Sequence, residues 1–558
     1  MSYRRAVFKP DQQHQALLFP PTLGDLLDEH HRVRLISRIV DGMDLSSIYQ
    51  TYKGGGSSAY SPKMILKVLL LAYSDRIYSC REIERACRES VPYLWLCGFS
   101  APDHNTLYRF RKYRLQDSLP KIHAHVLATL FDQGYINLDD YYLDGTKMEA
   151  ISGRYTAVWA KRAAKYSQSV QDRINAALAE LHDHWERQDA DDESDPPSPP
   201  SVDDSEAALQ AIAELNEVLC EQEPQDRNER LEVQKARTKL RNLAKNEVSR
   251  LADYERQLEV LDGRSSYAKT DTDAVFMRTK DDHLRNGQLK PSYNVQAGVC
   301  SHFVVNLTVH NTPSDMACFE GHLELLRQLL TERGLPLPST ICADAGYGRL
   351  QNYEYCKARG LTAYVKYSGY DHKKLKAEQC FQTRYLDYDA EHDVMICPQG
   401  EPMVARVTHL DKTSTGYPIK VTEYHAPRSV CQSCPLRLSC LNAGCKDPKP
   451  ADELPTHRVV KVNAAHRRAC LQAKELLDSE QGQRHRQLRN VQIEGFFAQL
   501  KANMGRRRLT MKGLVGARIE LGLTAVGMNL RRYARLVAEG IKQGGGLPSL
   551  EGLAPKMG

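Results

Sequence analysis

The chain has 558 residues, of which 41% are hydrophobic, so it is long enough for several domains with apolar cores. Its formal net charge of +6 by itself indicates no particular partner. The N-terminus lacks an apolar signal core, and the apolar run at residues 64–73 is too short to span a bilayer. We therefore expect a soluble cytoplasmic protein without membrane contact, whose 15 Cys are thiols or metal ligands rather than disulfides.

Residues 13–125 have the pattern of short helices. Pro62 and Ser79 mark two helix starts, and Asp103 is a good N-cap for a third helix over residues 104–114. The basic residues of this third helix are Arg109, Arg111, Lys112 and Arg114. The pattern fits a helix-turn-helix-like DNA contact, and it fits equally an ordinary helical domain with a solvated basic face.

A strand is predicted over residues 135–150, ending near Asp144. Residues 166–187 and 206–261 are then helical and highly charged. Between them, residues 189–206 hold eight acidic residues and no basic one, together with many Pro and Ser. This composition cannot bury enough apolar surface to order, so we expect a helical insertion with a disordered acidic tip.

Strands resume after the insertion, at residues 292–300 and 302–310, as an antiparallel hairpin. A helix, a strand, a helix and a strand follow, at residues 314–332, 339–343, 349–359 and 361–365. This order predicts an α/β fold with a mixed sheet and helices on its faces. Residues 367–480 then contain short strands and a Cys cluster, and residues 484–504 and 513–539 are helical.

Three carboxylates far apart in sequence are the candidate catalytic groups. Asp144 and Asp344 end apolar runs and are followed by Gly, and Glu494 lies on a helix face with Lys501 two turns further on. Two Asp and one Glu can hold Mg²⁺, and two such ions suit in-line displacement at a phosphodiester. Taken singly, each Asp would more often be a turn residue, and the Glu and Lys an ordinary exposed pair.

Other acidic residues compete for these roles. Asp139 and Asp140 lie just before Asp144, although they lack the Gly and Thr that follow it. Asp271, Asp273 and Asp315 lie in polar motifs that we do not assign to the triad.

The C-terminal part is basic, with twelve Lys or Arg and two Glu over residues 484–536. This excess suits the phosphate backbone of DNA. The candidate phosphate contacts there are Arg489, Lys501, Arg506, Arg507 and Arg508.

The Cys cluster predicts a structural zinc site. Cys431 and Cys434 have the Cys-x₂-Cys spacing of half a tetrahedral site, and Cys397 and Cys440 complete a Cys₄ set that leaves no open position for water. Unligated thiols are the alternative. Other candidate ligands are Cys445, His425 and His457.

The chain resembles a DDE-type insertion-sequence transposase with a ribonuclease H-like catalytic core, and it is most similar to the insertion sequence 1182 family. The matching stretches begin at Pro102, Leu143, Thr270, Tyr293, Thr312, Ala343 and Glu494. By position, the resemblance makes Asp144, Asp344 and Glu494 the catalytic triad and Lys501 the Lys of a Glu-x₆-Lys element. Related enzymes carry a Tyr and an Arg upstream. Gln487 and Asn490 stand at those positions here, and Arg489 is the neighbouring candidate substitute.

The resemblance implies an enzyme that binds the terminal inverted repeats of a mobile element, cleaves DNA with two Mg²⁺ or Mn²⁺ ions and joins the 3′-hydroxyl ends to target DNA. It also implies a homodimer or larger assembly on double-stranded DNA, associated with the bacterial nucleoid. Two alternatives are a ribonuclease H-like nuclease or resolvase without strand transfer, and an inactive DNA-binding regulator.

The expected division of the chain follows from these assignments. It comprises a helical DNA-binding domain (1–130), a ribonuclease H-like core (131–150, 265–366 and 481–510), a helical insertion (151–264, tip 189–205), a Cys-bearing insertion (367–480) and a basic helical C-terminal region (511–558).

Overall fold

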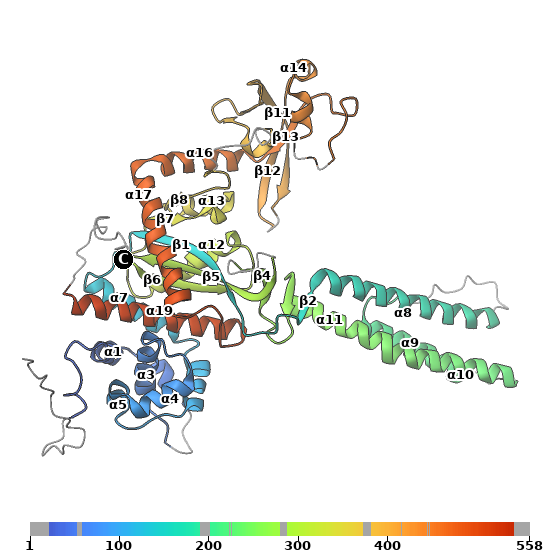
Figure 1. Cartoon of the computed structure of the whole chain (residues 1–558). Coiled ribbons are helices and arrows are strands. Elements are labelled where there is room, and N and C mark those ends of the chain that lie inside the picture. Colours follow the sequence, from blue (N-terminus) through green and yellow to red (C-terminus); the bar gives the residue numbers. More distant parts are fainter. Residues whose placement is uncertain are drawn as a thin grey trace, which may run out of the picture.

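The computed structural model describes residues 22–52, 58–189, 201–221, 224, 226–279, 287–371, 381–413, 416–443, 445 and 447–540. At the centre lies a curled mixed sheet with helices on both faces, as the sequence predicts (Figure 1). Helices gather below the sheet, a long helical arm projects to one side, and a small β module lies above (Figure 1).

The central sheet has the strand order β4-β5-β1-β7-β8, and β6 also pairs with β5. β5 is antiparallel to β1, β4 and β6, whereas β7 is parallel to β1 and β8 is parallel to β7. The strands are β1 (Asp140–Glu149), β4 (Val275–Arg278), β5 (Leu289–Cys300), β6 (Phe303–His310), β7 (Thr340–Ala343) and β8 (Thr362–Val365). The expected β5–β6 hairpin is confirmed, and its two turn residues, Ser301 and His302, both have a positive φ, as a tight primed turn requires.

One face of the sheet shares a hydrophobic core with the N-terminal helices. Leu143 of β1 belongs to the same cluster as Leu66 of α3 and Leu127 of α7. These helices are α1 (Arg32–Asp41), α2 (Ser46–Tyr49), α3 (Pro62–Ser74), α4 (Cys80–Glu89), α5 (Val91–Cys97), α6 (His104–Arg109) and α7 (Leu119–Asp132). The predicted helix starts at Pro62 and after Ser79 are confirmed, and the Asp103 carboxylate accepts bonds from two backbone N–H groups at the start of α6.

The opposite face is covered by the C-terminal helices. A continuous helical run comprises α17 (Glu480–Arg489), a π-helical segment (Asn490–Glu494), α18 (Gly495–Ala498) and a second π-helical segment (Gln499–Asn503). The long helix α19 (Gly513–Ala538) follows and packs against α3, α7 and β6, so it joins the N-terminal helices to the sheet. Two more helices, α12 (Phe319–Thr331) and α13 (Leu350–Ala358), precede β7 and β8.

The arm is the predicted helical insertion and has a small core of its own. It consists of α8 (Ala160–Asp189), α9 (Ser205–Glu221), α10 (Arg227–Asn242), a π-helical segment (Leu243–Val248) and α11 (Ser249–Leu261). At its base the short strands β2 (Ala157–Trp159) and β3 (Ser266–Ala268) pair, which the sequence did not predict. Most of the expected acidic tip, residues 190–200, lies outside the described residues. No helix in the described part of the chain is long and apolar enough to cross a membrane.

The β module holds the cysteine cluster. Its antiparallel sheet has the order β13-β12-β11-β10-β9. The strands are β9 (Tyr388–Asp389), β10 (Val394–Ile396), β11 (Pro402–Lys412), β12 (Pro418–His425) and β13 (Val459–Val462). Two short helices, α14 (Arg428–Ser433) and α15 (Arg437–Leu441), lie between β12 and β13, and α16 (Ala464–Asp478) leads back to α17.

The end of β1 differs from the prediction. The strand does not stop near Asp144 but continues to Glu149, because residues 142–149 remain paired with β5. Asp144 therefore lies in mid-strand.

The motif at residues 270–274 anchors the start of α19. Asp273 accepts a hydrogen bond of 2.8 Å from the Leu514 N–H, and Asp271 accepts one of 3.3 Å from the Gly513 N–H. N–H groups in the first turn of a helix have no acceptor within the helix, and negative charge is favourable at this end. Both acids thus have a structural explanation apart from the triad.

We expect Asp273→Ala to lower the free energy of unfolding by about 0.5–2 kcal/mol, the usual effect of losing a helix cap. Chemical denaturation measures this change. Thr272→Ala, which alters the exposed neighbouring side chain, is the matched control. Equal stability of the two variants would contradict the capping role.

Candidate active site

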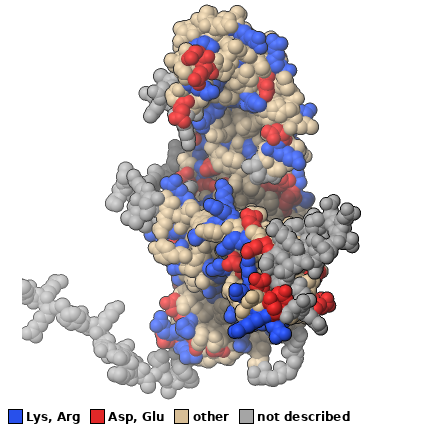
Figure 2. Space-filling model, turned by 90° about the vertical axis from the view of Figure 1, so that its right-hand side faces the viewer, with Lys and Arg blue, Asp and Glu red and all other residues tan. Residues whose placement is uncertain are grey.

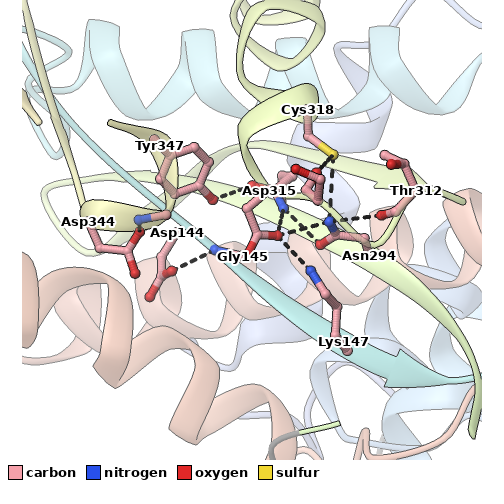
Figure 3. A network of polar contacts seen from close by, with 12 residues as sticks. Asp144, Gly145, Lys147, Asn294, Thr312, Asp315, Cys318, Asp344 and Tyr347 are labelled. Atoms are coloured by element: carbon pink, nitrogen blue, oxygen red, sulfur yellow. Dashed lines mark hydrogen bonds and ion pairs between the residues drawn. The ribbon is translucent and has the colours of Figure 1, made fainter. Parts of the chain in front are cut away.

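Two of the predicted carboxylates lie side by side because of the sheet register. In the parallel β1–β7 pair, Leu143 is opposite Ala343, so the next residues along the two strands are Asp144 and Asp344. The Asp144 side chain is only 11% exposed, whereas that of Asp344, in the turn after β7, is 39% exposed. The Asp344 carboxylate accepts a 2.8 Å bond from the Gly346 N–H, which fixes the turn (Figure 3).

Arg489 brings the third carboxylate to this pair. Its guanidinium nitrogens lie 3.0 Å from an Asp144 oxygen, 3.8 Å from an Asp344 oxygen and 3.7 Å from a Glu494 oxygen. The Arg489 side chain is 9% exposed, whereas that of Glu494 is 59% exposed. The three residues predicted as a triad therefore face one shared cation. Asp144 comes from β1, Asp344 from the turn after β7, and Glu494 from the helix that crosses these strands.

The π-helical segment over Asn490–Glu494 explains how Arg489 reaches the site. In a regular α-helix, residues five positions apart point about 140° away from each other. A π-turn, with its i→i+5 bonding, returns residue i+5 to nearly the same face. Arg489 and Glu494 thus share a face, whereas Gln487 and Asn490 are exposed. The sequence identified Arg489 as a candidate substitute but could not show the one-residue bulge that positions it.

The donor chemistry of this site fits a hard divalent cation. Three carboxylates meet a single positive charge, and carboxylate oxygens are the ligands that Mg²⁺ prefers. Among the described residues, however, no group of three or more His, Cys, Asp or Glu side chains is arranged to hold a metal ion. In this arrangement the Arg489 guanidinium lies where the three carboxylates converge.

A polar network supports the two strands from the other face of the sheet (Figure 3). One oxygen of Asp315 accepts from the Lys147 ammonium at 2.7 Å, from the Asn294 amide at 2.8 Å and from the Gln296 amide at 2.9 Å. The Gln296 carbonyl in turn accepts from the Tyr347 hydroxyl, in the turn after Asp344. The network therefore connects β1, β5, the segment before α12 and the turn after β7.

Gly145 is required by the same network. A Cβ atom at this position would lie 2.4 Å from the Gln296 amide nitrogen and 2.9 Å from an Asp315 oxygen. Gly145 and Asp315 stand out in the sequence, but the network that joins them was not predicted. Its signal was the alternation of polar residues, Asn294 and Gln296 on β5 and Lys147 on β1, within otherwise apolar strands.

The competing acidic residues lie elsewhere. Asp140 begins β1, about 13 Å along the strand from Asp144, and its carboxylate lies 4.0 Å from His485. Burial raises the pKa of Asp140. Asp139 is exposed and precedes the strand.

Two of the predicted DNA contacts, Arg506 and Arg111, have buried side chains. Arg506 is 2% exposed, is paired with the fully buried Glu520 and lies with its guanidinium carbon 3.4 Å from the centre of the Tyr78 ring. Arg111 is 5% exposed and donates to the Tyr73 hydroxyl and the Tyr78 carbonyl, each at 3.1 Å. Arg506 therefore links the C-terminal part of the chain to the N-terminal helices, whereas Arg111 makes its contacts within the N-terminal helical layer.

The other predicted basic contacts lie at or near the surface. Arg109 and Arg507 are exposed, and Lys501 is half-buried. The Lys112 ammonium lies over the rings of Tyr108 and Tyr113, and Arg508 donates to the carbonyls of Ala150 and Ser152. On the face of the molecule in Figure 2, Lys and Arg gather across the middle, below a hollow under the β module.

The four predicted zinc ligands line one small cavity of the β module: Cys397, Cys431, Cys434 and Cys440. Their thiols are not arranged as a metal site. Cys397 and Cys431 accept long hydrogen bonds from the backbone N–H groups of Glu401 and Arg458. Of the alternative ligands, Cys445 is exposed, and His425 pairs with His457 in a different cavity.

Comparison with known families agrees with the nature of this site. The model of a transposase DDE domain matches residues 396–534, which include Arg489 and Glu494, and the model of a transposase domain (DUF772) matches residues 21–113, the N-terminal helices. No curated protein and no solved structure matches the chain. The two family matches support a DDE transposase, a class of enzyme that acts on DNA and usually uses divalent metal ions.

We expect Arg489→Ala to destabilise the metal-free protein, because the three carboxylates lose their shared counter-charge. The loss can reach the roughly 3–5 kcal/mol seen when a buried ion pair loses one member. Adding Mg²⁺ or Mn²⁺ should restore more stability to the variant than it adds to the wild type, as thermal unfolding with and without metal will measure.

Arg484→Ala, an exposed position on the same helix, is the matched control. Arg489→Lys should retain part of the stability. If Arg489→Ala unfolds at the wild-type temperature under both conditions, Arg489 does not hold the carboxylates together.

Proposed function

We propose that this protein is a DDE transposase in which Asp144, Asp344 and Glu494 hold the catalytic metal ions. It would bind the terminal inverted repeats of a mobile element of the insertion sequence 1182 type, cleave phosphodiesters and transfer the 3′-hydroxyl ends to target DNA. The observation that carries the proposal is the convergence of the three carboxylates on the Arg489 guanidinium.

The sheet topology supports a ribonuclease H-like core. The order β6-β5-β1-β7-β8, with β5 antiparallel and β7 parallel to β1, brings two carboxylates together at adjacent strands. The helix that carries the third carboxylate packs on the same face. The arm would then be an insertion between the first two core strands, and the β module an insertion before the catalytic helix.

The residues would divide the chemistry as follows. Asp144 lies in a paired strand and Asp344 in a turn closed by the Gly346 N–H, so they would define the position of the bound phosphodiester. The more exposed Glu494 would complete the site from the helix. Arg489 would move from the carboxylates to a phosphate oxygen, and Lys501 on the same helix would make a second phosphate contact. Divalent metal ions, when bound, would activate the attacking oxygen and stabilise the leaving oxygen.

One site would serve both cleavage and joining, because only the nucleophile changes, from water to the 3′-hydroxyl. Joining two ends calls for a dimer or larger assembly. A nuclease or resolvase that cuts without joining is the alternative. Strand-joining assays with end-bearing oligonucleotides would distinguish the two.

We expect Asp144→Asn, Asp344→Asn and Glu494→Gln each to reduce nicking of an end-bearing duplex by at least about a thousandfold, since each removes several kcal/mol of transition-state stabilisation. DNA binding should remain nearly unchanged. Ca²⁺ should support binding but little cutting, because its coordination is looser.

Glu480→Gln, at the exposed start of the same helix, and Asp140→Asn are the control variants. Both should cut at near wild-type rates. A Glu494→Gln variant that still cut normally would mean that the third ligand lies elsewhere.

We further propose that Cys397, Cys431, Cys434 and Cys440 bind one structural Zn²⁺, which is supported by the shared cavity that they line. Elemental analysis should then find about one zinc per chain. Cys434→Ser should lose the zinc and the stability of the β module together, because metal binding and folding are coupled. Cys445→Ser should keep the metal, and metal-free protein of full stability would refute this site.

A further inference from the structure

A strongly basic cavity lies beside the helix that carries Glu494. It has a volume of about 590 Å³ and is bounded by the start of α1, Arg76 just beyond α3, the β5–β6 turn and the start of β6, residues 491–504 and the second half of α19. Its charged and titratable lining residues are His30, His31, Arg32, Arg76, His302, Arg531, Arg532 and Arg535. None of the lining residues is acidic, so the cavity concentrates positive charge.

Most of this charge is not neutralised within the protein. Arg32 pairs with Asp75 at 2.7 Å, and Arg535 lies 3.7 Å from Glu539. In the described part of the chain, the other three arginines of the cavity have no ion-pair partner: Arg76, Arg531 and Arg532.

Two groups of the cavity, Arg532 and His302, are less stable in their charged forms than they would be in water. Burial, followed by the charge of Arg535, lowers the pKa of Arg532 to about 10. Burial, followed by Arg532 and Arg535, lowers the pKa of His302 to about 4. Like charges that lie close together and partly buried raise the free energy of the folded state unless an anion binds between them. The cluster therefore does not stabilise the fold by itself.

The backbone at Arg76 is also unusual. Arg76 has φ of 68°, a left-handed conformation at the end of α3 where Gly is the common residue. The chain thus accepts a less favourable backbone at a position whose side chain lines the cavity. Such outliers gather at functional sites.

The cavity adjoins the proposed catalytic centre through one helix. Gln492, two residues before Glu494, lines the cavity, and its side-chain oxygen accepts a 2.5 Å bond from the His302 N–H. An anion held by the arginines would therefore lie against the helix that presents Glu494 to the carboxylate pair.

We propose that this cavity binds the phosphodiester backbone of the DNA being processed, next to the scissile bond. The inference deepens the proposed function and rests on it. Guanidinium groups suit phosphate oxygens because their donors form a planar fork, and several forks in one open cavity match consecutive phosphates better than a single small anion. Free phosphate shares this chemistry and is the other source to be tested.

The test compares DNA binding by two full-length variants at several salt concentrations. One carries Glu494→Gln alone, and the other carries Glu494→Gln together with Arg531→Ala and Arg532→Ala. The matched control is Arg327→Ala/Arg359→Ala, which removes the same charge from two arginines that pair with Glu324 away from the cavity. We expect the cavity variant to bind all duplexes more weakly and to flatten the plot of log K against log salt by about one unit for each lost contact. The control should retain the slope.

Two further measurements separate the outcomes. Thermal unfolding checks folding, and Arg531→Lys/Arg532→Lys should recover most of the binding if charge is what matters. An unchanged salt slope in the cavity variant would overturn the inference. So would a cavity that binds only free phosphate, in which case inorganic phosphate would stabilise the wild type while the cavity variant bound DNA as tightly as the wild type. If the slope falls but protein with Glu494 intact never cuts DNA, the cavity assignment stands and the proposed transposase activity fails.

Discussion

The candidate site depends on one electrostatic constraint, the placement of three carboxylates around the Arg489 guanidinium. Adjacent carboxylates repel each other, and two of these are fixed side by side by the pairing of β1 with β7. A buried cation that contacts both and also reaches Glu494 makes this arrangement tolerable in the absence of another charge. The helix is therefore held to the sheet by the same groups that we propose as ligands for metal and substrate.

The positions of these groups depend in turn on the opposite face of the sheet. Asp315 collects three donors from β1 and β5, and Tyr347 connects this network to the turn that holds Asp344. Because successive side chains of a strand point to opposite faces, Asp144 faces the site while Gly145 and Lys147 face the network on the other side of the sheet. This explains why Gly145 and Lys147 belong to the same short motif as Asp144.

Local patterns in the sequence predicted much of this architecture. The helix starts at Pro62 and Asp103, the β5–β6 hairpin and the helical arm all follow from caps, turns and periodicity. The three carboxylates were singled out by position and by resemblance, and the structure places them together around Arg489. Their metal-binding role stays a prediction.

Tertiary features were beyond the reach of these patterns. The basic run at the C-terminus predicted surface charge, yet Arg506, in the loop before α19, is buried against Glu520, a partner fourteen residues away in α19. Arg111 similarly satisfies hydrogen bonds inside the helical layer. Charge counts report composition, whereas burial depends on packing that no single segment encodes. The π-turn was likewise not predicted, since the one-residue shift that it introduces is hard to recognise in a short helical segment.

The same π-turn connects the carboxylate site to the basic cavity. By returning Arg489 to the face of Glu494, it leaves Gln492 on the side of the basic cavity, bonded to the β5–β6 turn. One short helical segment thus faces the carboxylates on one side and the arginines of the basic cavity on the other. Negative phosphates beside the helix and positive ions among the carboxylates would each satisfy charge that the protein alone leaves unbalanced. Binding of one should therefore favour binding of the other, because both act on the same segment.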